Sequence, residues 1–197
     1  MEDVYIIGVS CTAFGKLPHR SFKDLSREAY LEVLRDAGLD SGDAIEQAWF
    51  GNCGMGSFGQ ANIRGQVCFT PLVREGLFPE RVPMINVEGG CATASMALHG
   101  DYKDILSGQV DMALAIGVEK TFFPGDPAKT LEIFEGGIDQ LDPQEWMDYY
   151  RAAGEASGKP FQPHAAGGTL FMDTYAMQAA HHMKRFGTSA EQIAVGA

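Results

Sequence analysis

Short apolar runs alternate with amphipathic segments along the first 120 residues. Runs rich in β-branched or continuously apolar residues predict buried strands at positions 4–9, 48–51, 83–87 and 111–118. Apolar residues at helical spacing predict helices at positions 22–38, 60–76 and 92–106. We expect the second helix to be broken or shifted near Pro71. The last strand is almost continuously apolar, which is typical of a strand covered on both faces.

The ends of these segments carry recognisable signals. Ser21 and Asp24 have the spacing of a capping box, and Gly38 follows the last helical position. Strands that alternate with helices imply β-α-β crossovers. We therefore predict an α/β fold whose mixed, largely parallel sheet has helices on both faces.

The pattern changes after Glu119. Residues 121–168 interleave aromatic with acidic side chains, and a helical segment at 170–185 ends at Gly187. A second capping signature at 188–191 begins one more helix. We predict a βαβ domain over 1–120 and an inserted, mainly helical and irregular loop subdomain over 121–197. Its aromatic rings form either a small core of their own or the wall of a pocket.

Composition excludes several classes of function. The formal net charge of −11, with scattered Lys and Arg, argues against a nucleic-acid partner. No apolar run approaches the length of a membrane span, and the acidic N-terminus does not resemble a signal peptide. The four cysteines form no CxxC pair, which predicts reduced thiols in a cytoplasmic protein and no metal site. They are Cys11, Cys53, Cys68 and Cys91.

Cys91 occupies a distinctive place in the stretch MINVEGGCATASMALHG, residues 84–100. A strand that runs through Gly89 and Gly90 into a helix puts this cysteine at the helix N-terminus, where unpaired amides and the macrodipole favour negative charge. A thiol there loses its proton more readily, and thiolate is the nucleophilic form. The glycines permit a sharp turn and leave the sulfur accessible. The opposing interpretation is an inert, buried cysteine.

Two other chemistries are compatible with parts of the sequence. Residues 54–59 spell GxGxxG after a predicted strand, and Glu80 follows at roughly the distance of the acid in a dinucleotide-binding fold, about 20 residues. The motif does not open the first β-α-β unit, and Pro79 precedes the acid. A cysteine hydrolase is the other alternative, but the sequence around Cys91 lacks the closing glycine of a nucleophile elbow.

The chain resembles the N-terminal half of the thiolases. The resemblance is carried by 62–64 (NIR), the strand into 86–94 (NVEGGCATA), 105–108 (ILSG) and 115–120 (AIGVEK). Residues 121–197 are similar to the loop domain of the family, and 171–194 are similar to its sterol-carrier-protein-type branch. Gly90 before the cysteine and Thr93 after it are variants of the usual family pattern.

The resemblance implies an acyltransferase that exchanges acyl groups of 3-ketoacyl-CoA thioesters. Cys91 would be the catalytic nucleophile, coenzyme A a substrate and not a bound cofactor, and the Cys91 N–H a donor to an oxyanion. The aromatic residues at 122–161 favour a bulky or aromatic acyl group. The resemblance also implies a homodimer or higher oligomer, and some relatives of this branch work with a small OB-fold zinc-binding subunit.

The chain also departs from the family. The histidine that activates the nucleophile, the second cysteine or histidine and a glycine-rich oxyanion loop would lie beyond Ala197, so we expect no turnover by this chain alone. Of the five histidines, His164 is the one in a loop of small residues, and the others are predicted to be structural or solvated; they are His19, His99, His181 and His182. A thiolase-like aldolase and a non-catalytic scaffold subunit remain alternatives.

Overall fold

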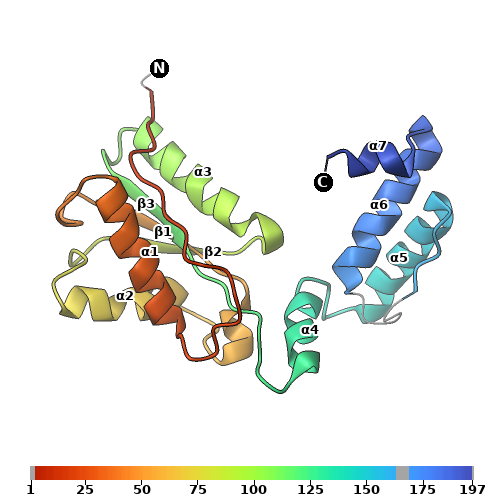
Figure 1. Ribbon diagram of the computed structural model, residues 1–197, viewed down its shortest axis with the longest axis horizontal. Coiled ribbons are helices and arrows are strands. Elements are labelled where there is room, and N and C mark those ends of the chain that lie inside the picture. The colour runs from red at the N-terminus through yellow and green to blue at the C-terminus, as the bar shows by residue number, and fades with distance from the viewer. Residues whose placement is uncertain (1–2, 163–168, 197) are drawn as a thin grey trace. The chain divides into compact units, whose positions relative to one another are not determined.

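The computed structural model describes residues 3–162 and 169–196. The chain divides into two compact units, Met1–Gly125 and Asp126–Ala197. Figure 1 shows the strands in the first unit and the helices α4 to α7 in the second. We refer to them as the first unit and the second unit.

A parallel sheet of three strands forms the centre of the first unit. The strands are β1 (Gln47–Gly51), β2 (Met84–Val87) and β3 (Ala113–Gly117), in the order β2-β1-β3. Phe50 is paired with Asn86 on one side and with Ile116 on the other. All three strands end at the same edge, and the loops that follow them therefore meet there.

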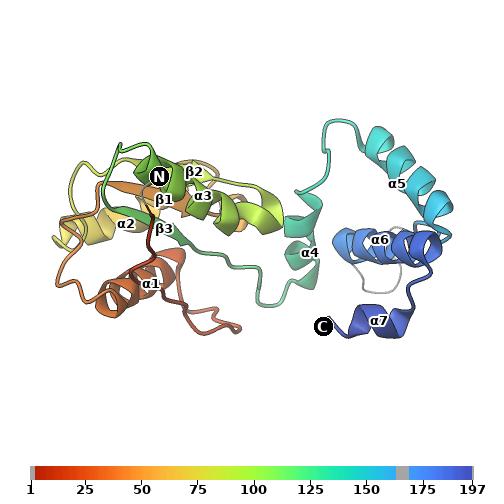
Figure 2. The same cartoon turned by 90° about the horizontal axis from the view of Figure 1, so that it is seen from above.

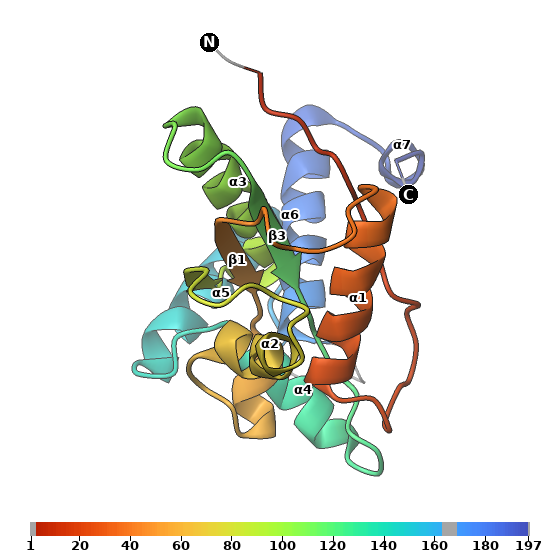
Figure 3. The same cartoon turned by 90° about the vertical axis from the view of Figure 1, so that its left-hand side faces the viewer.

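Helices cover both faces of this sheet, as predicted. α1 (Phe22–Asp36) and α2 (Arg64–Arg74) lie on one face, and α3 (Thr93–Leu106) lies on the other (Figures 2 and 3). On the α1–α2 face, Tyr30 and Phe69 pack edge to face and Phe50 is fully buried. On the α3 face, Gly100 lets the helix approach the ring of Trp49, because a Cβ there would come within 2.4 Å of the indole.

The helix signals in the sequence are confirmed at α1. Ser21 accepts a hydrogen bond from the Asp24 N–H at 3.1 Å, and the Asp24 carboxylate accepts one from the Ser21 N–H at 2.8 Å. This reciprocal pair is the predicted capping box.

The predicted strand at 4–9 is wrong. Residues 3–14 have no regular secondary structure, and the segment is tied to α1 through the Val9 N–H, which donates to Asp36 at 2.8 Å, and the Ser10 hydroxyl, which donates to the Ala29 carbonyl at 2.7 Å. A groove of about 710 Å³ separates it from β3. The β-branched run therefore lacks a strand to pair with among the described residues, and propensity alone does not form a strand.

Two finer expectations also fail. α2 continues through Pro71 without a break, since the helix ends at Arg74 and the Glu75 N–H still donates to the Pro71 carbonyl at 3.1 Å. β3 is not buried on both faces: Leu114 and Ile116 are buried, whereas Ala115 and Gly117, which alternate with them, are exposed. The small residues on the exposed face made the run look continuously apolar.

The second unit is helical. Its helices are α4 (Pro127–Glu135), α5 (Pro143–Ser157), α6 (Leu170–Phe186) and α7 (Ala190–Ala194). α5 packs along α6, and α6 ends at Gly187 in the left-handed conformation, as predicted. No helix in the described part of the chain combines the length and the apolar character needed to cross a membrane.

Candidate functional site

Cys91 lies in the turn that joins β2 to α3. A short 3-10 turn, Gly90–Ala92, precedes α3, so the cysteine stands two positions before the helix begins at Thr93. Gly90 has a φ of +57°, which favours glycine, and a Cβ on Gly89 would come within 2.2 Å of the Met96 sulfur. The two glycines therefore serve different needs, one conformational and one steric.

The Cys91 thiol is exposed and unbonded. Within residues 3–162 and 169–196, the N–H of Cys91 also has no hydrogen-bond acceptor, whereas the Ala92 N–H donates to the Gly89 carbonyl at 3.0 Å. An exposed sulfur beside its own unbonded N–H, two positions before a 14-residue helix, is placed for anion stabilisation. The position agrees with the sequence prediction; the catalytic role stays a prediction.

The Thr93 side chain holds the glycine turn from inside. Its hydroxyl donates to the Gly90 carbonyl at 2.8 Å and accepts from the Gly89 N–H at 2.9 Å. The Cys53 sulfur lies 2.9 Å from the same hydroxyl and 3.2 Å from the Gly90 carbonyl oxygen. Thr93 is buried, so these bonds are shielded from competing water.

Glu119 connects the ends of β1 and β3. Its carboxylate accepts hydrogen bonds from the Cys53 N–H at 2.8 Å and from the Gly54 N–H at 3.0 Å. The buried Asn52 donates to the Val118 carbonyl at 2.6 Å and accepts from the Met55 N–H at 3.0 Å. These side chains cross-link the loops at the carboxyl edge of the sheet, where Cys91 also lies.

Arg64 and Asn86 complete this network. Arg64 at the start of α2 donates to the Asn52 carbonyl at 2.5 Å. Asn86 accepts from the Gly65 N–H at 2.7 Å, and so fixes α2 to β2. Sequence reasoning did not single out this network. The available signal was that Asn52 and Glu119 are polar residues placed directly after predicted strands.

The four cysteines occupy different environments. Cys68 is buried in the core and Cys53 is half-buried, and burial raises the pKa of both thiols. Cys11 is exposed like Cys91, but it lies in the irregular N-terminal segment. Exposure therefore does not distinguish Cys91 from Cys11; the helix start does.

The GxGxxG motif does not form a phosphate-binding loop here. Residues Gly54–Phe58 form a 3-10 turn, and the amides of Cys53 and Gly54 at its start are already bonded to Glu119. Glu80 is exposed in a turn and does not follow a strand. A bound pyrophosphate would have to displace the Glu119 carboxylate, and the geometry thus disfavours a nicotinamide cofactor.

The histidines are not gathered at Cys91 in the described part of the chain. His19 and His99 are exposed. His181 and His182 are exposed on α6 in the second unit, where the His182 ring nitrogen lies 3.1 Å from the Thr188 hydroxyl. His164 lies outside the described residues. The described residues also contain no cluster of three or more His, Cys, Asp or Glu side chains that could hold a metal ion.

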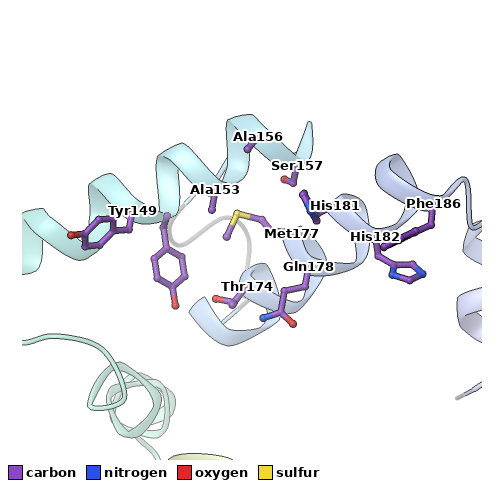
Figure 4. Close-up of a pocket in the computed structure, with 11 residues that line it drawn as sticks. Tyr149, Ala153, Ala156, Ser157, Thr174, Met177, Gln178, His181, His182 and Phe186 are labelled. Carbon is purple, nitrogen blue, oxygen red and sulfur yellow. The ribbon is translucent and has the colours of Figure 1, made fainter.

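The aromatic residues of 121–168 take two roles. Trp146, Tyr150 and Phe161 form a small ring cluster, with centroids 5.4 Å apart for Trp146–Tyr150 and 5.2 Å for Tyr150–Phe161. Tyr149 and Tyr150 also border a cavity of about 660 Å³ between α5 and α6 (Figure 4). Both interpretations of these rings from the sequence therefore have support.

Comparison with known proteins agrees with this architecture. Residues 4–122 match the family described as thiolase, N-terminal domain. An acetyl-CoA acetyltransferase of Methanothermobacter thermautotrophicus is 33% identical over 196 residues, which is 99% of this chain and 43% of that protein. Benzoylsuccinyl-CoA thiolase subunit BbsB of Thauera aromatica is 30% identical over 98% of this chain and 41% of its own length.

A third relative is sterol carrier protein 2 of Gallus gallus, which is 28% identical over 97% of this chain and 31% of its own length. This chain thus spans less than half the length of these curated relatives. The family match covers the sheet, the glycine turn and the loops at the carboxyl edge. The chain belongs to the thiolase family.

Proposed function

We propose that this chain supplies the nucleophile of a thiolase that cleaves or forms 3-ketoacyl-CoA thioesters. The observation that carries the proposal is the exposed Cys91 thiol beside its own unbonded N–H, in the turn directly before α3. Membership of an acyltransferase family supports the same chemistry. The reactants are an acyl-CoA and coenzyme A.

The cleavage begins with the thiolate of Cys91 attacking the 3-keto carbon. The S–C bond forms while the bond between C2 and C3 breaks, and C2 keeps the electron pair and takes a proton to leave as a shortened CoA ester such as acetyl-CoA. The thiolate of a second CoA then attacks the acyl-cysteine carbonyl and releases Cys91. The free Cys91 N–H is one donor for the oxyanion formed in these steps.

The proton transfers need groups beyond those at the site. No described histidine contacts Cys91, and the activating histidine of the thiolases is expected outside this chain. A further stretch of polypeptide or a partner chain would supply it. Assembly as a homodimer, or with a small OB-fold zinc-binding subunit, stays a prediction that the site itself does not require.

The bulky or aromatic acyl group stays a prediction from the aromatic residues, which border a cavity within the second unit. The cavity lies between α5 and α6 (Figure 4), and its polar lining residues are Ser157, Thr174, Gln178, His181 and His182. Its walls include Tyr149, Ala153, Met177 and Phe186. A cavity of about 660 Å³ is within the range of small-molecule sites, about 300–1,000 Å³.

Thiolysis by the complete protein that carries this chain tests the proposal. We expect Cys91→Ser to abolish release of acetyl-CoA, and Cys11→Ser, the other exposed cysteine, to leave the rate unchanged. Acyl-CoA should also protect Cys91 from iodoacetamide. Full activity of Cys91→Ser would overturn the proposal and favour the aldolase or scaffold alternative.

A further inference from the structure

The Thr93 hydroxyl bonds to both glycines of the turn that presents Cys91. Two consecutive glycines have the largest conformational freedom of any dipeptide, and Gly90 must stay at a φ of +57°. The Thr93 hydroxyl bonds to the Gly89 N–H and to the Gly90 carbonyl, so it closes the turn on both sides of the bond that joins the glycines. Without these two bonds, the turn keeps the bond from the Ala92 N–H to the Gly89 carbonyl and the bond from the Gly90 N–H to the exposed Glu88 carboxylate, but it loses the two that the buried Thr93 side chain shields from water.

The Cys53 thiol contacts the same hydroxyl from another strand. A threonine hydroxyl has one hydrogen and two acceptor positions. The hydroxyl donates to the Gly90 carbonyl and accepts from the Gly89 N–H, and the Cys53 sulfur lies 2.9 Å from its oxygen. The Cys53 thiol also donates to the Gly90 carbonyl at 3.2 Å, so it contacts both the hydroxyl and the turn itself. Burial raises the pKa of Cys53, which keeps this thiol protonated and able to donate at neutral pH.

Cys53 is itself fixed to the sheet. Its N–H donates to Glu119 at 2.8 Å, and Glu119 follows β3. A continuous series of contacts therefore runs from the end of β3 through Cys53 and Thr93 to the turn that carries Cys91. The residues in this series come from segments that are 40 and 66 positions apart in sequence.

We propose that Thr93 is a positioning residue for Cys91 and that the Cys53 thiol anchors the Thr93 hydroxyl to the sheet. The inference rests on the proposed function for the role of Cys91. The clamp, by which we mean the contacts of the Thr93 hydroxyl with Gly89, Gly90 and Cys53, is a property of this chain. The Thr93 hydroxyl and the Cys53 thiol contact the glycine turn and each other. They hold the amide and the sulfur of Cys91 in place relative to the start of α3.

Thr93→Val and Thr93→Ser form the matched pair that tests this clamp. Valine keeps the shape and removes both hydrogen bonds, whereas serine keeps the hydroxyl and removes the methyl group. We expect Thr93→Val to speed hydrogen exchange of the Gly89 and Ala92 amides by about tenfold, the effect of losing a shielded pair of hydrogen bonds. It should also slow iodoacetamide alkylation of Cys91 by several fold. Thr93→Ser should leave the exchange rate and the alkylation rate as they are in the unchanged chain.

Cys53 gives a second, independent test. Cys53→Ala should also speed hydrogen exchange at the turn and slow alkylation of Cys91, but by less than Thr93→Val. Cys53→Ser, which keeps a donor, should have a smaller effect than Cys53→Ala. Because the two residues act as one unit, the double variant Thr93→Val with Cys53→Ala should be no worse than Thr93→Val alone. Melting temperature identifies any variant that is merely unfolded.

The outcomes separate the two proposals. Hydrogen exchange in Thr93→Val within twofold of the unchanged chain would overturn the clamp. The clamp would also be overturned if Thr93→Val sped exchange together with a fall in stability and Thr93→Ser showed the same fall. Thr93 would then act through packing and not through its hydroxyl group. An unreactive Cys91 in the unchanged chain, with the exchange effect intact, would overturn the proposed function and leave the clamp standing.

Discussion

At the scale of single residues, the chain places each thiol in a different chemical setting. Cys68 fills the core, Cys53 anchors a turn, and Cys91 stands free beside the start of α3. These settings depend on neighbours distant in the sequence. The local pattern of two glycines and a cysteine predicted where Cys91 lies, but nothing near Cys53 indicated that Thr93 would receive it.

Asp101 is a buried carboxyl group whose charged form opposes folding. It is buried on α3, its Oδ1 has no hydrogen-bond partner, and burial followed by the charge of Asp104 raises its pKa to about 7. A carboxyl group whose folded pKa lies above its unfolded value binds a proton more tightly when folded. Its contribution to stability is therefore present at low pH and is lost as pH rises through about 7.

Asp101→Asn should accordingly stabilise the chain at pH 8.5 by about 1–3 kcal/mol relative to the unchanged chain, with a smaller gain at pH 5.5. Urea unfolding at the two pH values measures the difference. Glu80→Gln, which removes an exposed carboxylate, is the control and should show no such pH dependence. An equal effect of Asp101→Asn at both pH values would contradict the account.

At the scale of secondary-structure elements, close approach of α3 to the sheet sets the position of the turn before it. The contact depends on Gly100, because any side chain there meets the Trp49 ring. The Trp49 indole N–H also donates to Asp104 on the same helix at 2.7 Å. The close contact at Gly100 and this hydrogen bond therefore both help to hold α3 against β1.

Gly100→Ala should lower the free energy of unfolding by about 1–3 kcal/mol, as expected when a methyl group is forced into a packed contact. The change should also shift the fluorescence of Trp49. Gly15→Ala is a suitable control, because a Cβ there meets nothing within 4 Å. A Gly100→Ala chain as stable as the unchanged one would mean that α3 does not approach β1 this closely.

Most elements of the first unit could be predicted from the sequence because their signals are local. Ser21 and Asp24 begin α1 through bonds within one turn, and β1 and β2 are short apolar runs bounded by polar residues. The failures are non-local. The run at 4–9 has strand propensity but no strand partner in the described chain, and α2 passes Pro71 because its tertiary contacts outweigh the lost hydrogen bond.

The site was predictable to a smaller extent. Cys91 could be placed because a strand, a glycine pair and a helix follow one another directly. Glu119, Asn52 and Arg64 could not be assigned, since their contacts exist only after β1 and β3 have paired and α2 has packed. Their importance lies in a network that no short window of sequence contains.

At the scale of the whole molecule, each unit has its own packed interior. Tyr30, Phe50, Phe69 and Leu72 belong to the core of the first unit, and the rings of Trp146, Tyr150 and Phe161 pack within the second. The network around Cys91 draws all its members from the first unit. The geometry of the nucleophile therefore does not require the second unit.

Residues 1–125 expressed alone should fold and keep the environment of Cys91. We expect the backbone amide signals of residues 89–93 and the Trp49 indole signal to match those of the 197-residue chain in a nitrogen–proton correlation spectrum. Collapse of these signals to unfolded positions would show that the first unit depends on the second.

The rate of alkylation of each cysteine in the intact chain tests the central claim most directly. Mass spectrometry of peptides after timed exposure to iodoacetamide gives four rate constants from one experiment. The account predicts that Cys91 reacts first, about tenfold faster than the equally exposed Cys11, with the half-buried Cys53 and the buried Cys68 slowest. Equal rates for Cys91 and Cys11 would contradict it, because the start of α3 would then give the Cys91 sulfur no added reactivity.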